Sequence, residues 1–449
     1  MPPPLCRSAR GRSGICWHEV ICMQIHVVRA RETLYGVARQ YGVSMTLLGR
    51  LNQVPVGGAL AVGQTLVIYE PEQVHVVRPG ETLAGIARRE GVTVLSLYQN
   101  NYFLGGQPSI LPDEELIIAL KGERSGTLAV NGYAYPFIPR TLLHAVLPYM
   151  TYLTPFTYGI TAEGGLVIPD DAWLVAAAAE YRAQPWMHLS TLTEAGSFDS
   201  RLGGALLENE ATQARLIDAI VANMTAKGYR GLDVDFEYLE GRQAAAYAAF
   251  IEALRQRLDP LGWPVTVALA PKSGAGQKGL LYEGHDYAAL GRAADSVLLM
   301  TYEWGYTAGP PMAVAPLPQV RRVLDYALTE IPPEKIFLGV PTYGYDWPLP
   351  FRQGITRAPS LSPQQALALA RRYGAEIQYD ETAQSPWFRY TAENGTLHEV
   401  WFEDARSSLA KFRLAADNGL QGVGLWSLMR DAPQTYLVLH GAFGIEKAE

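Results

Sequence analysis

The chain is poor in cysteine, in positive charge and in long apolar runs, and each shortage excludes a class of protein. Its three cysteines, Cys6, Cys16 and Cys22, all precede Met23, so no disulfide or zinc framework holds the rest together. The 37 Lys and Arg against 44 Asp and Glu give a net charge of -7, without the positive field that phosphate backbones require. Apolar runs such as residues 297–300 are far shorter than the roughly 20 residues of a membrane span. We therefore expect no nucleic-acid partner and no membrane span.

The composition that remains is that of a folded chain of several domains. Hydrophobic residues make up 48% of the 449 residues and charged residues 18%, which argues against disorder and coiled coil. At roughly 150 residues per domain, there is room for about three domains. Residues 1–22 contain three prolines, three arginines and only broken apolar stretches, so no signal peptide is recognisable. We expect this segment to be a disordered tail or a misassigned start, with Met23 the natural first residue.

An internal repeat with a shift of 49 residues follows this segment. Between residues 26–52 and 75–101, 14 of 27 positions are identical, including a Glu-Thr-Leu triplet and the final asparagine. Each copy begins with a β-branched strand and continues with a helix, for which Thr33 or Thr82 is the expected N-cap. A second short helix ends near the asparagine. Closing strands are expected at residues 65–69 and 115–119.

This repeat resembles the lysin motif (LysM), a βααβ module that binds glycans containing N-acetylglucosamine. The resemblance rests on Val-Val-Arg-x-x-Glu-Thr-Leu, Ile-Ala-Arg and the final asparagine, and it places the two modules at residues 23–70 and 72–121. It implies peptidoglycan or another N-acetylglucosamine-containing glycan as the partner, and two sites in tandem gain avidity on a polymer. The alternative is that both modules only hold another part in place, without affinity for glycan.

Residues 122–449 alternate between strand-like and helical patterns. Eight apolar runs, at residues 127–133, 152–158, 186–191, 231–238, 265–270, 296–302, 336–342 and 422–427, read as parallel strands. The clearest helical patterns span residues 210–227, 242–258, 318–330 and 405–418. The fold class is therefore α/β: a (β/α)8 TIM barrel after two βααβ modules. A small α+β insertion is expected after the seventh strand, at about residues 348–404.

The fourth strand carries three acidic residues on one face. In Gly-Leu-Asp-Val-Asp-Phe-Glu, side chains alternate with period two, so Asp233, Asp235 and Glu237 point the same way. Neighbouring buried carboxylates push at least one pKa up, which keeps a carboxyl group protonated for acid catalysis. Glu237 lies nearest the barrel mouth and is the expected proton donor. Two alternatives stay open: a solvated acidic face, and an oxygen-ligand site for a divalent metal.

The same strand resembles the Asp-x-x-Asp-x-Asp-x-Glu signature of family 18 glycoside hydrolases. The resemblance implies that Glu237 is the catalytic acid, that Asp235 orients the substrate acetamido group and that Asp233 modulates Asp235. The first Asp of the signature is replaced here by Arg230. In Met-Thr-Tyr-Glu, Tyr302 matches the residue that hydrogen-bonds the acetamido oxygen.

Further residues are expected to bind substrate. Trp426 matches the tryptophan that forms the floor of the sugar site in this family. Aromatic residues in loops either offer apolar faces to sugar rings or serve only in packing. The predicted binding set is Met300, Glu303, Trp304, Tyr343, Trp347 and Trp426. His188 and His285 have no partner pattern and are expected to be structural.

Two LysM copies before such a barrel resemble the N-acetylglucosaminidases that degrade spore-cortex peptidoglycan during germination. The resemblance implies retaining, substrate-assisted hydrolysis of β-1,4 bonds next to N-acetylglucosamine, with no metal or organic cofactor. It places the protein at the spore coat or cortex, or at the cell wall, and we expect a monomer. The alternatives are a chitinase and a non-hydrolytic glycan-binding spore coat protein.

Overall fold

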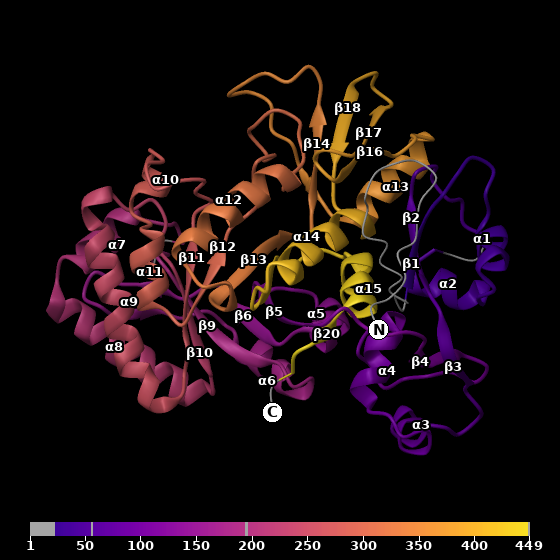
Figure 1. Cartoon of the computed structure of the whole chain (residues 1–449), viewed down its shortest axis with the longest axis horizontal. Coiled ribbons are helices and arrows are strands. Elements are labelled where there is room, and N and C mark those ends of the chain that lie inside the picture. Colours follow the sequence, from indigo (N-terminus) through magenta and orange to yellow (C-terminus); the bar gives the residue numbers. More distant parts are fainter. Residues whose placement is uncertain (1–22, 55–56, 194–195, 448–449) are drawn as a thin grey trace, which may run out of the picture.

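The computed structural model describes residues 23–54, 57–193 and 196–447 (Figure 1). The predicted tail or misassigned start at residues 1–22 lies outside them. Among the described helices, none combines the length and apolar character that a membrane crossing needs.

Two small βααβ modules open the described chain, as predicted, and lie side by side at one end of the molecule (Figure 1). Their elements are β1 (Met23–Val27), α1 (Leu34–Tyr41), α2 (Met45–Leu51) and β2 (Thr65–Tyr69), then β3 (Pro71–Val76), α3 (Leu83–Glu90), α4 (Val94–Asn100), the 3-10 helix η1 (Tyr102–Leu104) and β4 (Glu115–Leu120). In each module the first and last strands pair antiparallel.

Residues shared by the two repeats explain why both copies fold alike. Thr33 and Thr82 are N-caps, as predicted, because each hydroxyl accepts the backbone N–H three residues later at 3.1 Å. The buried Asn101 donates to the carbonyls of Leu97 and Ile117 and accepts the N–H of Ile117, at 2.8–2.9 Å. The equivalent asparagine makes the same bonds in the first module. Each asparagine thus ties the second helix to the closing strand.

The predicted eight-stranded parallel barrel is confirmed in the described part of the chain. Its strands, in chain order, are β5 (Thr127–Ala134), β6 (Tyr152–Pro155), β9 (Gln184–Ser190), β10 (Gly231–Asp235), β11 (Val265–Leu269), β12 (Ser296–Leu299), β13 (Ile336–Pro341) and β19 (Gly422–Trp426). Each pairs with the next, and β19 closes the ring on β5. The short β20 (Gly444–Ile445) adds to β5, and β7 (Gly159–Ile160) and β8 (Leu166–Val167) form a hairpin.

Helices surround this barrel and bury the outward-facing side chains of its strands. They are α5 (Arg140–Val146), α6 (Ala172–Glu180), α7 (Ser200–Leu207), α8 (Glu210–Lys227), α9 (Ala244–Leu258), α10 (Leu280–Glu283), α11 (Tyr287–Ala293), α12 (Leu317–Glu330), α14 (Ala405–Asp417) and α15 (Pro433–Ala442), with 3-10 turns η2 (Leu147–Tyr149), η3 (Gly241–Gln243), η4 (Asp259–Leu261) and η5 (Pro333–Lys335). Strand residues such as Val234, Val267 and Leu338 are fully buried in the core between the two layers.

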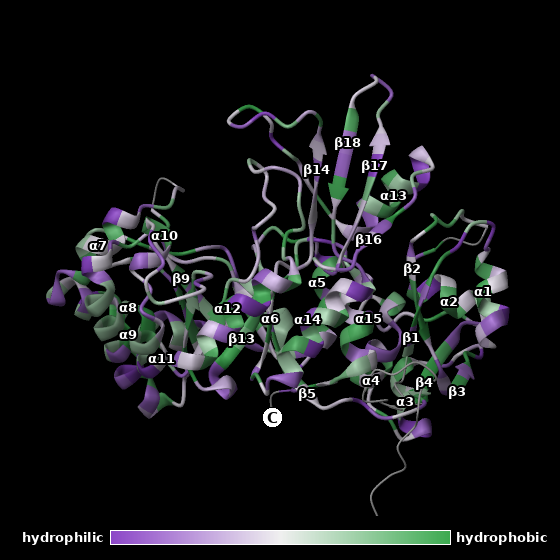
Figure 2. Ribbon diagram, turned by 45° about the horizontal axis from the view of Figure 1, so that its top comes forward, coloured by the Kyte–Doolittle hydropathy of each residue, from purple (hydrophilic) through white to green (hydrophobic). Residues whose placement is uncertain are grey.

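The insertion is a five-stranded antiparallel sheet with one helix, and it rises above the barrel in Figure 2, where its strand β18 carries a hydrophilic stretch. Its elements are β14 (Gly344–Pro348), β15 (Ser360–Leu361), α13 (Pro363–Tyr373), β16 (Gln378–Asp380), β17 (Ser385–Thr391) and β18 (Leu397–Trp401). The sheet begins earlier than the expected residue 348, because β14 pairs along its length with β18.

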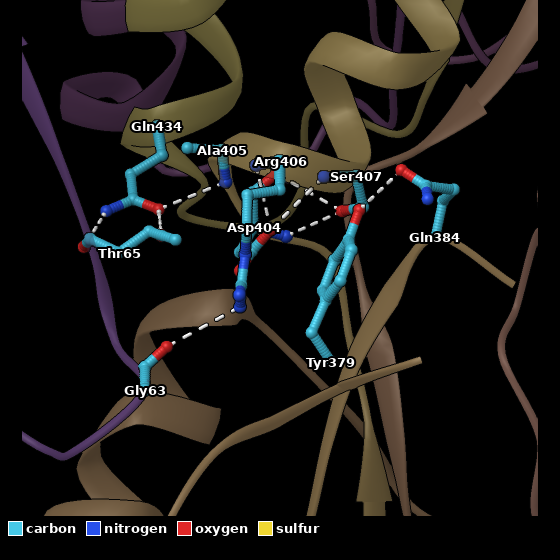
Figure 3. Close-up of polar contacts among 9 residues, drawn as sticks. All are labelled: Gly63, Thr65, Tyr379, Gln384, Asp404, Ala405, Arg406, Ser407 and Gln434. Atoms are coloured by element: carbon cyan, nitrogen blue, oxygen red, sulfur yellow. Dashed lines mark hydrogen bonds and ion pairs between the residues drawn. The ribbon is translucent and has the colours of Figure 1, made fainter. Parts of the chain in front are cut away.

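The first LysM module packs directly on the barrel and the insertion. Thr65 of β2 exchanges two 2.6 Å hydrogen bonds with the side chain of Gln434 in α15, and Arg406 of α14 reaches the carbonyl of Gly63 (Figure 3). The hydroxyl of Tyr69 donates to the carbonyl of Leu437 at 2.8 Å. The module is therefore held by polar contacts to helices of the barrel.

Candidate active site

Strand β10 presents its carboxyl groups to the barrel interior because its apolar residues occupy the other face. Phe236 is fully buried and stacks on Tyr247 and Phe250 of α9, with ring centroids 5.7 Å and 6.0 Å away. The alternation of side chains then directs Asp233 and Asp235 inward. β10 pairs in parallel with β9 and β11, which places these residues among the strand ends at the carboxyl side of the barrel.

Asp233 lies deepest of the three acids and is fully buried. Its Oδ2 accepts a 2.7 Å hydrogen bond from the hydroxyl of Tyr133 on β5, and its buried Oδ1 has no partner among the described residues. Burial raises the pKa of Asp233 to about 7, although the bond from Tyr133 lowers it in part. This carboxyl group is therefore poised to hold or release a proton near neutral pH.

Asp235 and Glu237 also have raised pKa values. Burial raises the pKa of Asp235 well above its ordinary value, and the negative charges of Glu237 and Asp233 raise it further. Its buried Oδ1 has no hydrogen-bond partner among the described residues. Burial likewise raises the pKa of Glu237. One carboxyl group of the set thus keeps its proton at a pH where an exposed glutamate has lost it.

A cavity of about 580 Å³ opens over these two acids, a size typical of ligand sites. It brings together seven of the ten predicted site residues: Asp235, Glu237, Met300, Tyr302, Glu303, Trp304 and Trp426. Asp233 lies beneath it and does not line it. The cavity is mainly apolar and aromatic with a few acids, which suits a sugar ring that has a C–H face and polar substituents.

Tyr302 follows β12 and faces the acids as a neutral hydrogen-bond donor. Burial raises the pKa of its hydroxyl well above the ordinary value, and the negative charges of Asp235 and Glu237 add to the effect. The phenol therefore keeps its proton throughout the pH range in which the carboxyl groups titrate. Its position in the cavity beside them allows a donor and a carboxylate to bind one substituent of a ligand together.

Glu303 lies at the junction of this cavity with a second one of about 360 Å³. Its backbone has a φ of 64°, a left-handed conformation that is costly for a side-chain residue. The hydroxyls of Tyr343 and Tyr345 both donate to its carboxylate, the latter at 3.0 Å. These bonds lower its pKa, while burial raises it by a larger amount. Tyr343 itself lines the second cavity.

The prediction that Trp347 contacts substrate is wrong. The residue lies in β14 rather than in a loop, its side chain is 0% exposed, and its indole N–H donates to the carbonyl of Gly309 at 2.8 Å. It lines neither cavity. The insertion sheet and the loop that carries Gly309 shield Trp347 from solvent. No local pattern in the sequence indicates that these two distant segments bury it.

Two histidines have definite partners that the sequence did not indicate. His188 lines the larger cavity with its Nε2 3.8 Å from Oδ2 of Asp235, and burial lowers its pKa to about 3, so its ring is neutral. His285 accepts the N–H of Ala270 at Nδ1, so its Nε2 donates to the carbonyl of Phe236. His285 thereby steadies the backbone next to Glu237. The register of β9 against β10, which pairs His188 with Asp233, is the signal that could have found His188.

Tyr133 and Phe156 are further cavity residues that the sequence search missed. Both lie at the ends of strands β5 and β6, so a search of all eight strand ends for aromatic residues would have included them. In the described part of the chain, no group of three or more His, Cys, Asp or Glu side chains could hold a metal ion. The alternative of a metal site at Asp233, Asp235 and Glu237 therefore lacks a suitable ligand set.

Comparison with known proteins adds independent information. The profile of glycosyl hydrolases family 18 matches residues 196–431, and that of the LysM domain matches residues 26–68 and 75–119. The chain is 41% identical over 434 residues to the cortical fragment-lytic enzyme of Bacillus subtilis (strain 168), covering 95% of this chain and 99% of the relative.

Two solved structures are similar over nearly the whole chain. The spore cortex-lytic enzyme SleL of Bacillus cereus superimposes with a TM-score of 0.81 at 33% identity, and that of Bacillus megaterium QM B1551 with a TM-score of 0.80 at 35% identity. Each comparison covers 95% of this chain and 99% of the other.

Proposed function

Because this chain belongs to the glycosyl hydrolases of family 18 and carries two LysM domains, we propose that it is a cortical fragment-lytic enzyme, hydrolysing fragments of spore cortex peptidoglycan during germination. Its relatives of similar length bear the names cortical fragment-lytic enzyme and spore cortex-lytic enzyme. The bond cut is the β-1,4 bond next to N-acetylglucosamine. The LysM modules bind peptidoglycan and keep the enzyme at the cortex or coat of the spore.

The observation that carries this proposal is a set of three carboxyl groups with raised pKa values, of which Asp235 and Glu237 line the larger cavity and Asp233 lies beneath it. Glu237, whose pKa is raised by burial, protonates the glycosidic oxygen as the bond to the anomeric carbon breaks. Asp235 and Tyr302 hold the substrate acetamido group, whose oxygen attacks the anomeric carbon to form an oxazolinium ion. Glu237, now ionised, takes a proton from a water molecule as that water attacks the anomeric carbon. The attack opens the oxazolinium ring, and the product keeps the anomeric configuration of the substrate. Asp233 shares the negative charge that stabilises the cation.

Substitution of the acid tests these roles. We expect Glu237→Gln to remove nearly all turnover, because the amide cannot donate the proton, and Asp235→Asn to lower kcat by about 100-fold or more. The measurement is digestion of muropeptide fragments with reduced ends, with chitin oligomers alongside, followed by mass spectrometry of the products. New reducing ends at N-acetylglucosamine are expected from the fragments.

The controls separate chemistry from folding and binding. Both variants should keep the thermal unfolding temperature of the native protein and its binding to insoluble peptidoglycan. Near-normal cleavage by Glu237→Gln would contradict the assignment of the acid, and cleavage of chitin oligomers without cleavage of the fragments would contradict the proposed substrate.

A further inference from the structure

The second cavity adjoins the proposed catalytic cavity at Trp426 and Glu303, which line both. A ligand longer than one sugar therefore extends from one cavity into the other. Phe137, Tyr135 and Trp426 form a series of rings along this path, with centroids 5.1 Å and 6.3 Å apart, and Phe137 is 75% exposed. Exposed aromatic faces of this kind pack against the C–H faces of sugar rings.

Arg430 distinguishes the second cavity from the first. It lies in the loop after β19, and its Nη2 donates to the hydroxyl of Ser360 in β15 at 2.5 Å. Among the described residues that line either cavity it is the sole Lys or Arg. It makes no ion pair with any described carboxylate. Its remaining N–H donors are free for a ligand, and its bond to Ser360 of the insertion holds the guanidinium at the cavity wall.

The positive charge of Arg430 indicates which kind of glycan the second cavity binds. The acids Asp235, Glu237 and Glu303 line the two cavities, and the tyrosine hydroxyls already bind Glu303. A neutral glycan carries no net charge for these groups to repel, whereas a glycan that bears carboxylates is repelled by them. A guanidinium in the adjoining cavity, which Glu303 also lines, offsets that repulsion and binds carboxylates through paired N–H donors.

We propose that Arg430 forms a subsite for an acidic sugar, binding a carboxylate on the residue next to the one on which Glu237 acts. This inference rests on the proposed function, since in peptidoglycan N-acetylglucosamine alternates with sugars that carry a lactyl ether, which can be free or extended by a peptide. Chitin has no such group. The subsite therefore selects the substrate class, and the ligand chemistry is a carboxylate from the lactyl group or from the peptide.

The test uses three oligosaccharides with the same alternating sugars. The first has free lactyl acids, the second has lactyl groups extended by an acidic peptide, and the third has lactyl methylamides and no charge. We expect the native enzyme to prefer one or both acidic substrates to the neutral one by about 10- to 100-fold in kcat/KM, chiefly through KM. Added salt should reduce the preference. The acid that is preferred identifies the source of the carboxylate.

Variants then assign the preference to Arg430. Arg430→Gln should abolish it by raising KM for the acidic substrates, while Arg430→Lys should retain part of it. Arg357→Gln is the control, because Arg357 is an exposed arginine of the insertion that supplies Ser360, and it lines neither cavity. It should leave the preference intact.

Three results would overturn the inference: equal turnover of all three substrates by the native enzyme, an undiminished preference in Arg430→Gln, or an equal loss on acidic and neutral substrates. The third indicates a purely structural arginine. Failure of the proposed function looks different, because the native enzyme would then cut none of the three.

Discussion

The carboxyl group of Asp233 shows how individual side chains set the chemistry of this site. It has one hydrogen bond, from Tyr133, and a pKa of about 7, while Asp235 above it has a raised pKa because it is buried near two other acids. Groups this close titrate as a set, since three negative charges together inside the barrel are too costly. The set therefore retains at least one proton near neutral pH, and Glu237, which faces the cavity, is placed to deliver it.

Removing the Tyr133 hydroxyl, which donates to Asp233, should shift the pH profile of kcat/KM to higher pH. The bond from Tyr133 favours the charged form of Asp233, so Tyr133→Phe raises the pKa of that group above about 7. If the acids must carry a negative charge to stabilise the oxazolinium ion, the acidic limb of kcat/KM shifts upward by about 0.4 to 1 pH unit. The measurement is the rate on a defined fragment between pH 4 and pH 9.

The matched control for this profile is Tyr152→Phe. Tyr152 also lies in the barrel interior, stacked on Trp186 with centroids 3.9 Å apart, and its hydroxyl does not bond to a described carboxyl group. It should leave the profile in place. A downward shift or no shift in Tyr133→Phe would show that Asp233 does not set the acidic limb.

At the scale of the elements, the features that depend on local spacing are predictable from sequence. The period of two in β10 indicates that Asp233 and Asp235 share a face, and the repeat indicates two βααβ modules with Thr33 and Thr82 as caps. The eight strands were found because each is an apolar run that a helical pattern follows. Each of these signals is read from a short stretch of sequence, or from the comparison of two such stretches, so tertiary contacts are not needed to read them.

Features that depend on distant elements were not predictable in the same way. Trp347 is buried because β14 pairs with β18, about fifty residues later, and because Gly309 approaches it. The contact of His188 with Asp235 depends on the register of two strands. Arg430, which lines the second cavity, donates there to Ser360 of the insertion, about seventy residues earlier in the chain. In each case a contact between separate elements decides the role of the residue.

The asparagine at the end of each LysM repeat should be essential to its module. Asn101→Ala removes the side-chain partner of the buried N–H and carbonyl of Ile117, while the carbonyl of Leu97 keeps its bond from the backbone N–H of residue 101. We expect a loss of about 2 to 4 kcal/mol in the free energy of unfolding of that module. Hydrogen exchange should show the loss of protection concentrated in α4 and β4.

The exposed turn residue Asn394, which accepts the N–H of Thr396 in the insertion, supplies the control. Its substitution by alanine should change exchange only around that turn. Unchanged protection of α4 and β4 in Asn101→Ala would contradict the structural role of the repeated asparagine.

At the scale of the whole molecule, both LysM modules pack directly against the barrel. Gln434 and Leu437 of α15 bond the first module, and His440 of the same helix contacts Asn100 of the second at 2.9 Å. These contacts are buried, unlike those of a module on a flexible linker. The positions of the modules relative to the catalytic cavity are therefore held by the fold.

Two neighbouring glycines allow this packing to be tested in the intact chain. Gly105 and Gly106 both have left-handed backbones, with φ of 59° and 68°, so alanine costs a similar backbone strain at either position. A Cβ at Gly106 would lie 2.1 Å from the carbonyl oxygen of His144 in α5, whereas a Cβ at Gly105 meets nothing within 4 Å. We expect Gly106→Ala to lower the free energy of unfolding by about 2 kcal/mol more than Gly105→Ala, because the module must move away from the barrel. Denaturant unfolding of both variants measures the difference, and hydrogen exchange should report it in η1 and α5. Equal losses in the two variants would mean that the second LysM module is not packed against α5 in solution.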